Sequence, residues 1–140
     1  MPDLPLAHDA MEEILQSSPF HQVLSLSIES TDEATQTLVM RLKFGERISR
    51  AEGTGQHHGG VIASLIDIAG DFALVWQLGY GVPTINFRTD YLRPAINTDL
   101  FAHAKVRRIG RTVSVCDIDV FSHDEKLVAI GRGTYATAAG

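Results

Sequence analysis

Two kinds of group that could act on a carbonyl carbon stand on one stretch of this chain. Residues 58–72 read HGGVIASLIDIAGDF, so Gly59 and Gly60 open a long apolar helical pattern that contains Asp67. The first backbone N–H groups of a helix lack partners and carry partial positive charge, so they suit an oxygen that gains negative charge. A carboxylate among Leu, Ile and Ala side chains is costly to bury. The stretch therefore predicts an oxyanion site and a candidate base or nucleophile on one element.

The spacing of these groups predicts that they serve different sites. Gly60 and Asp67 are seven positions apart, which is about 10 Å along a helix axis. A reacting carbonyl carbon must lie about 3 Å from its attacker and from its oxyanion donors. One helix cannot meet both conditions, whereas two antiparallel helices related by a two-fold axis can. We therefore expect an obligate dimer with two shared sites.

The helix that carries these groups is predicted to span residues 59–78. Its few polar residues include Ser64, Asp67 and Asp71, which fall on one narrow stripe of a helix surface. A helix that is apolar on most of its sides is usually enclosed by other structure. Gly79 and the following Gly81 and Pro83 are expected to end it.

The remaining pattern predicts an antiparallel sheet. Residues 8–17 have the spacing of a short amphipathic helix, which Pro19 is expected to end. Alternating residues predict a hairpin from Val23–Ser30 and Thr35–Phe44, with its turn near 31–34 and a loop over 45–56. Further strands are expected at 84–92, 100–108, 112–122 and 127–137. This order predicts one α+β domain over residues 1–140, with about six antiparallel strands wrapped around a central helix.

Composition excludes several classes of protein. The 140 residues are 44% hydrophobic, with a formal charge of −5 and a pI near 5.6. A nucleic-acid-binding surface is usually basic, so we expect no nucleic-acid partner. The acidic, proline-containing start does not resemble a signal peptide, and the 59–78 stretch contains two aspartates, so we expect no membrane span. The single Cys116 fits a reducing compartment, and a cytoplasmic location is expected.

Several motifs in their order along the chain resemble one known family. They are His58-Gly59-Gly60 followed by six residues and Asp67, a strand from Thr84, the segment DYLRPA at 90–95, the hairpin RIGRT at 108–112 and the closing GRGT at 131–134. The chain is similar to the hotdog-fold acyl-CoA thioesterases, specifically the PaaI-type group of phenylacetate degradation. The resemblance covers most of residues 20–137.

The resemblance implies hydrolysis of a small or medium acyl- or aryl-acyl-CoA without metal or cofactor, CoA being part of the substrate. It implies that the thioester carbonyl rests on the N–H of Gly60 or Gly59, with Asp67 as nucleophile or as general base for water. His58 would orient the substrate or its thiolate leaving group, and Thr84 would assist the water. The family usually has Asn six residues before the motif histidine, where this chain has Glu52. Glu52 is therefore either a second carboxylate in the pocket or part of a differently arranged loop.

The same resemblance implies a binding path for CoA and a homodimer or homotetramer. The phosphates need cations, and the candidates are Arg108 and Arg111, with Arg107 beside them and Arg93 expected nearby. The pantetheine arm would follow the backbone at two segments. These comprise Tyr91, Leu92, Arg93, Pro94 and Ala95, together with Ile109 and Gly110. Gly59 and Ser64 complete the expected substrate contacts.

Plainer interpretations exist for several of these residues. Asp71 is expected to be structural or to line the pocket. His57 is expected to be an exposed loop residue, because adjacent positions diverge by about 100° and give no metal pair with His58. Phe72 and Trp76 are core residues or walls of the acyl pocket. Each arginine of the 107–111 hairpin could be an ordinary solvated side chain.

Two other functions stay open on the sequence alone. The first is an acyl-CoA-binding module without catalysis, because a fold does not fix a function. The second is a hotdog enoyl-CoA hydratase or dehydratase, which would use a histidine such as His57 or His58 as its base. A buried Asp67 beside the thioester favours the thioesterase, since a pure binder gains nothing from it.

Overall fold

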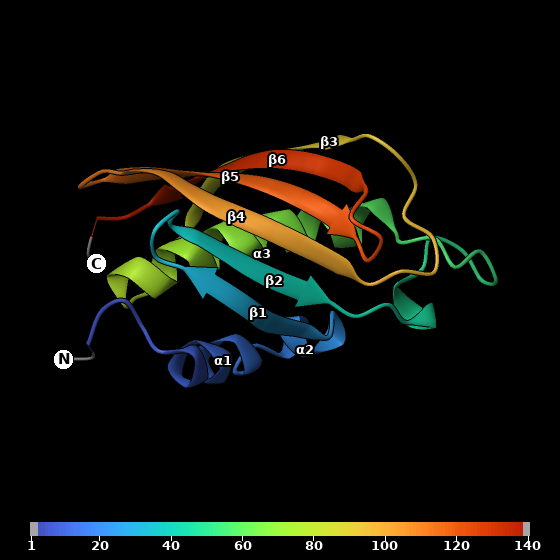
Figure 1. The fold of residues 1–140 in the computed structure, drawn as a ribbon, viewed down its shortest axis with the longest axis horizontal. Coiled ribbons are helices and arrows are strands. Elements are labelled where there is room, and N and C mark those ends of the chain that lie inside the picture. The colour runs from blue at the N-terminus through green and yellow to red at the C-terminus, as the bar shows by residue number, and fades with distance from the viewer. Residues whose placement is uncertain (1–2, 139–140) are drawn as a thin grey trace.

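The computed structural model describes residues 3–138 and shows a six-stranded antiparallel sheet curved around one long helix (Figure 1). The helices are α1 (His8–Gln16), α2 (Pro19–Val23), the 3₁₀ turn η1 (Glu46–Ile48) and α3 (Gly59–Leu78). The strands are β1 (Leu26–Asp32), β2 (Thr37–Leu42), β3 (Thr84–Tyr91), β4 (Leu100–Ile109), β5 (Val113–Ser122) and β6 (Leu127–Ala136). Their order in the sheet is β1-β2-β4-β5-β6-β3. The expected sheet around a central helix is confirmed.

Helix α3 begins and ends where the sequence predicts. His58 is its N-cap, and Gly79 closes it in the left-handed conformation with a φ of 83° and an N–H that donates to Val75 O. The helix is long and apolar enough to cross a membrane, but it is the buried core helix of this fold. Phe72 and Trp76 are 3% and 2% exposed, so they belong to the core of the single chain.

The sheet contacts α3 through one face. Leu100, Ala102, Ala104 and Val106 of β4 are buried, and the positions between them are more exposed, as period-two alternation requires. Gly131 of β6 lies where an added Cβ would come within 2.7 Å of an Ile66 side-chain carbon, so only glycine permits this close approach of helix and strand.

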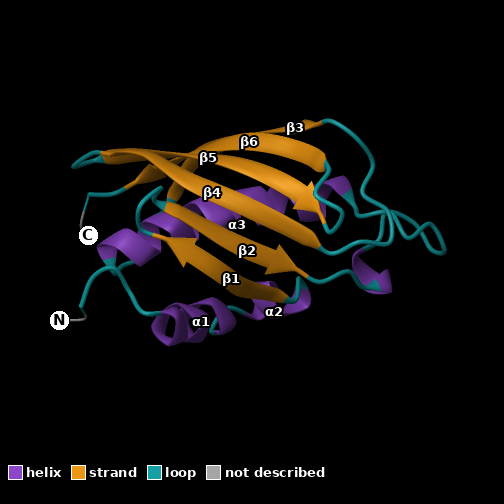
Figure 2. Ribbon diagram, in the orientation of Figure 1, coloured by secondary structure: helices purple, strands orange, loops and turns teal. Residues whose placement is uncertain are grey.

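The N-terminal segment differs from the prediction in two places. Pro19 begins a second short helix, α2. Proline breaks a helix when it stands in the interior, but it fits the first helical position. Val23 is the last residue of α2 and not the start of a strand, so β1 begins at Leu26 and the turn of the hairpin moves to residues 33–36. Helices α1 and α2 run beside β1 (Figure 2).

Strand β3 forms an open edge of the sheet. It pairs only with β6, and most of its residues are exposed. Ile85 is 53% and Phe87 38% exposed in the single chain. Unpaired edges that carry apolar side chains are usually covered in folded proteins.

Candidate active site

Asp67 is half-buried on α3 and is held by two neighbours. Its Oδ1 accepts a hydrogen bond from Thr84 Oγ1 at 2.7 Å, and its backbone oxygen accepts one from Tyr135 Oη at 2.8 Å. The fully buried Tyr135 ring fits because Gly70 and Gly133 leave room for its hydroxyl; a Cβ at either position would come within 2.2 Å of it. The carboxylate is thereby placed at the open edge of β3.

Asp71 follows Asp67 by one helical turn and is more enclosed. Its buried Oδ1 has no hydrogen-bond partner among residues 3–138. The pKa of Asp71 is raised to about 7, chiefly by burial, with a smaller rise from the charge of Asp67 and an opposing effect of a backbone hydrogen bond at Val82. Near neutral pH this carboxyl is therefore partly protonated.

The start of α3 offers one free backbone donor. His58 Nδ1 accepts from Gly60 N–H at 2.8 Å, and the N–H groups of Val61 and Ile62 donate to His58 O. Within residues 3–138 the Gly59 N–H has no acceptor, so it is the donor available to a substrate oxygen. Tyr91 Oη donates to Gly59 O at 2.6 Å and ties the end of β3 to the start of the helix.

The prediction that His57 is an exposed loop residue is wrong. The side chain is 2% exposed, its Nε2 donates to Thr98 O at 2.6 Å, and its ring meets the Phe44 ring edge-on at 5.0 Å. The reason is tertiary, because the β3–β4 connection folds over this loop and the His57 N–H donates to Ala95 O. Burial lowers the pKa of His57, so it is neutral at neutral pH.

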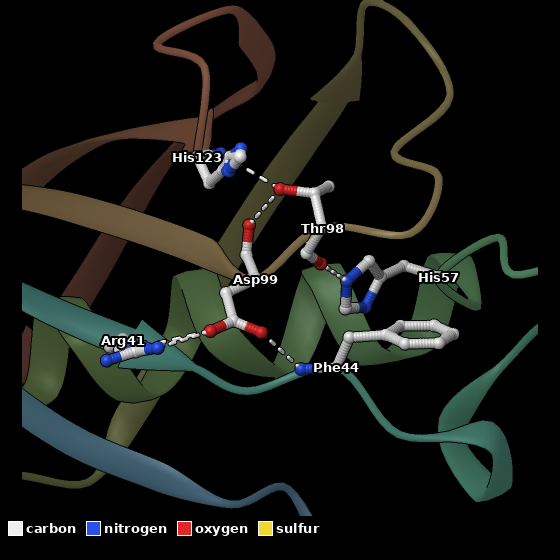
Figure 3. A network of polar contacts seen from close by, with 6 residues as sticks. All are labelled: Arg41, Phe44, His57, Thr98, Asp99 and His123. Carbon is white, nitrogen blue, oxygen red and sulfur yellow. Dashed lines mark hydrogen bonds and ion pairs between the residues drawn. The ribbon is translucent and has the colours of Figure 1, made fainter.

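A network of hydrogen bonds anchors His57 to three parts of the fold (Figure 3). Asp99 accepts from Arg41 Nη2 at 2.6 Å and from the Phe44 N–H at 2.9 Å. Thr98 precedes Asp99 in the chain. Its carbonyl oxygen accepts a hydrogen bond from His57 Nε2, and its Oγ1 accepts one from the backbone N–H of His123. Because His57 immediately precedes the N-cap of α3, this network fixes where the helix begins.

A pocket of about 580 Å³ lies beside the start of α3. It contains the predicted substrate contacts Gly59, Gly60, Tyr91, Leu92, Arg93 and Pro94. Arg50, which the sequence did not single out, also lines it, together with the buried His57. Neither Arg50 nor Arg93 forms an ion pair within the described part of the chain, so both can bind an anion.

The 108–111 hairpin lies at the other end of the sheet. Val113 pairs with Ala136 and Thr84 with Tyr135, whereas Tyr91 pairs with Ala129. The seven steps from Thr84 to Tyr91 span about 24 Å, so within one chain the prediction that Arg93 lies near the hairpin arginines is wrong. The β3–β6 register, which the sequence does not show, sets this separation.

Two of the hairpin residues are engaged within the chain, and the others are exposed. Gly110 donates its N–H to Ser114 Oγ and accepts from Thr137 Oγ1 at 2.7 Å. Arg107 pairs with Asp117 at 3.4 Å, while Arg108, Ile109 and Arg111 are exposed. Ser64, on the polar stripe of α3, donates to Gly60 O at 2.8 Å.

Glu52 lies with neither half of the site, that is, neither with Asp67 and Thr84 nor with the pocket at the start of α3. It lies in an exposed turn at residues 51–53 and is absent from the lining of the pocket at the start of α3. Of the two alternatives for Glu52, the single chain therefore favours a differently arranged loop and not a second carboxylate in the pocket. Across residues 3–138, no group of three His, Cys, Asp or Glu side chains is arranged to hold a metal ion.

Comparison with known proteins gives the family. A profile described as the thioesterase superfamily matches residues 54–129. A Halobacterium salinarum protein provisionally named an esterase is 35% identical over 92% of this chain and 93% of its own length. The acyl-coenzyme A thioesterase PaaI of Escherichia coli is 32% identical over 80% of this chain and 77% of its own.

Solved structures agree with this result. The structure of Escherichia coli PaaI, from the phenylacetic acid degradation operon, superposes with a TM-score of 0.78 at 26% identity, covering 96% of this chain and 98% of that one. An X-ray structure of another thioesterase superfamily protein gives a TM-score of 0.86 at 32% identity, covering 92% and 96%. The sheet wrapped on its central helix is the α+β hotdog fold. This chain belongs to the thioesterase superfamily.

Proposed function

We propose that the protein is an acyl-CoA thioesterase whose active sites are shared between two chains. The observation that carries this proposal is the position of the two site halves on α3 and β3. Thr84, at one end of β3, contacts Asp67, and Tyr91, at the other end, contacts Gly59. One chain therefore holds both halves, but they lie too far apart to act on one carbonyl group.

Antiparallel pairing of two β3 edges would bring the halves together. In such a pair Thr84 of one chain lies opposite Tyr91 of the other, about 5 Å away. Asp67 is hydrogen-bonded to Thr84 and Gly59 to Tyr91. The pairing of Thr84 with the mate's Tyr91 therefore brings Asp67 of one chain near Gly59 of the other. The 108–111 hairpin of one chain also reaches the Arg93 side of the other, which supports joint binding of the CoA phosphates.

The chemistry that we propose needs only groups of the chain and water. The thioester oxygen accepts from the free Gly59 N–H, which stabilises the negative charge that develops there. Thr84 occupies Oδ1 of Asp67 and leaves Oδ2 to take a proton from the attacking water, or to attack the carbonyl carbon itself. The carbon–sulfur bond breaks and CoA leaves as its thiolate. With water as the nucleophile the free acid forms directly. With Asp67 as the nucleophile an acyl–Asp67 anhydride forms, which a water molecule then hydrolyses to the free acid and the carboxylate.

His58 would assist the leaving group. Since its Nδ1 accepts from Gly60, the neutral ring carries its proton on Nε2. That N–H can donate to the sulfur as the CoA thiolate departs. We assign no catalytic role to Glu52.

Complementation between two inactive variants tests the shared site. Asp67→Asn removes the base, and Gly59→Pro removes the free N–H while keeping a residue that suits the first helical position. Each variant alone should lose at least about 10² in kcat. Refolded or co-expressed together, they should recover about a quarter of the wild-type activity, because half of the dimers are mixed and each mixed dimer has one intact site. Absence of recovery would reject the shared site.

A panel of acyl-CoA thioesters with a thiol-reactive dye tests the reaction. Thiol release that disappears in Asp67→Asn supports the thioesterase. Binding without thiol release from any member of the panel would identify a binding module. Loss of enoyl-CoA absorbance without thiol release would identify a hydratase.

A further inference from the structure

The enclosed Asp71 lies beside the reactive Asp67, but the proposed reaction does not use it. The two residues are one helical turn apart on α3, which is about 6 Å along the helix axis. The buried Oδ1 of Asp71 has no hydrogen-bond partner, and Asp71 forms no ion pair, in the described part of the chain. Enclosing a carboxyl in this way is costly. Enclosed acids next to a reactive group often belong to functional sites.

The other titratable groups around Asp71 carry no charge at neutral pH. Tyr135 of β6 and Cys116 of β5 pack against this turn of α3. Tyr135 Oη donates to Asp67 O at 2.8 Å, and the Cys116 thiol donates to a carbonyl oxygen of the helix. Burial raises the pKa of both groups, that of Cys116 to about 12, so both stay protonated. A backbone hydrogen bond at Val82 favours the Asp71 carboxylate. Asp67 is therefore the charge with which an ionised Asp71 interacts.

We propose that Asp71 and Asp67 act as a pair, in which the negative charge of Asp71 makes Asp67 more reactive toward the thioester. This inference rests on the proposed function. Whether Asp67 attacks the carbonyl carbon or activates water, the reaction moves negative charge from Asp67 to the thioester oxygen at the mate's Gly59 N–H. An ionised Asp71 repels the charge on Asp67 and so favours this transfer. Asp71 keeps its own protonation state during the step, exchanges its proton with solvent between turnovers, and acts only through Asp67.

The pair makes the reaction rate depend on pH near neutrality. The pKa of Asp71 is raised to about 7, so the fraction of chains with an ionised Asp71 increases as the pH rises through that value. Two charges one helical turn apart interact appreciably at a site that is partly shielded from water. The rate of thioester cleavage should therefore increase on the order of tenfold between about pH 6 and about pH 8.

A pH profile of kcat/KM on one acyl-CoA tests the pair. In the wild type the profile should contain the tenfold step near pH 7. Asp71→Asn keeps the shape of the side chain but cannot ionise, so its profile should lack the step and stay near the low rate of the protonated wild type. Asp71→Glu, which returns a carboxyl to this position, should restore a step. An ionisation of the substrate would be present in every profile, so the comparison between variants removes it.

The matched control is Asp9→Asn, which removes the same charge from a fully exposed position on α1 and should leave the profile unchanged. NMR titration of the Asp71 side-chain carboxyl carbon in the wild-type chain gives a second measurement that needs no variant. Equal profiles in the wild type and Asp71→Asn, or an Asp71 carboxyl that titrates away from the kinetic step, would overturn the pair alone. A wild-type chain that releases no thiol at any pH would reject the thioesterase and the pair with it.

Discussion

Thr84 decides which oxygen of Asp67 is free to react, because its hydroxyl bonds Oδ1 at 2.7 Å. Thr84→Val keeps the shape and removes this hydrogen bond, so the carboxylate loses its fixed orientation. We expect kcat to fall on the order of tenfold with little change in KM. Thr84→Ser, which keeps the hydroxyl, should retain most of the activity. Steady-state kinetics on one acyl-CoA would decide, and equal rates for Val and Ser would show that the hydroxyl does not position the base.

Asp71 makes the stability of the protein depend on pH. Its pKa rises from an ordinary 3.8 to about 7 in the folded chain, so between these values the folded state binds more protons than the unfolded state. Folding stability therefore falls as pH increases from about 4 to about 7, by at most about 4 kcal/mol.

Asp71→Asn removes this titration. We expect the variant to gain stability relative to the wild type as pH rises from 4 to 7, and the difference to stay constant above that range. Urea unfolding at several pH values measures it. A difference that does not change with pH would show that Asp71 is ionised in the folded protein as it is in the unfolded chain.

The start of α3 depends on the buried His57 ring. His57→Leu leaves the partly buried Thr98 carbonyl without its donor, which should cost about 1–3 kcal/mol. His57→Gln can still donate to this oxygen and should cost less. Thermal unfolding of both variants at pH 7.5 compares them.

The same histidine predicts an acid-sensitive element. The pKa of His57 in the folded protein is below its ordinary value of 6.5, so the folded state binds fewer protons than the unfolded state. Wild-type stability should therefore fall as pH drops through 6.5, and His57→Gln should reduce that fall. An unchanged pH dependence in His57→Gln would assign the loss to other groups.

Helix α3 was predictable to the residue, whereas the segments around it were not. Gly59 and Gly79 are local signals that act within one turn of the helix, so the sequence shows them directly. Alternation alone placed Val23 in a strand, although its neighbours and Pro19 favour a short helix.

Some residues of the candidate site could likewise be predicted from the sequence, and others could not. Asp67 and Gly59 were identifiable as candidates because their spacing has chemical meaning, and Thr84 because the resemblance to the hotdog-fold thioesterases marks its position. The burial of His57 and the role of Tyr135 were not, because a histidine before a helix and a tyrosine in a strand carry no local sign of what packs on them. The distance between Arg93 and the hairpin arginines depends on strand register, which is a property of the whole sheet.

At the scale of the whole molecule, the open edge of β3 predicts association. Ile85 is 53% exposed on this edge. Ile85→Lys would place a charge at the expected contact, where charged side chains are disfavoured. We expect the dimer to weaken at least tenfold, with activity falling in proportion to dimer content. Sedimentation equilibrium and kinetics over a range of protein concentrations test this, with Ile14→Lys on α1 as the control. A fully active monomeric Ile85→Lys chain would reject shared sites.

The separation of Gly59 and Asp67 along α3 has a genetic consequence. A chain altered at one of these positions leaves a wild-type mate with one intact site in a mixed dimer. A chain altered at both supplies a defective half to each site and silences its mate completely. If the sites are shared, either substitution alone leaves activity in dimers that contain one wild-type chain. An allele that carries both substitutions abolishes that activity and is therefore dominant-negative.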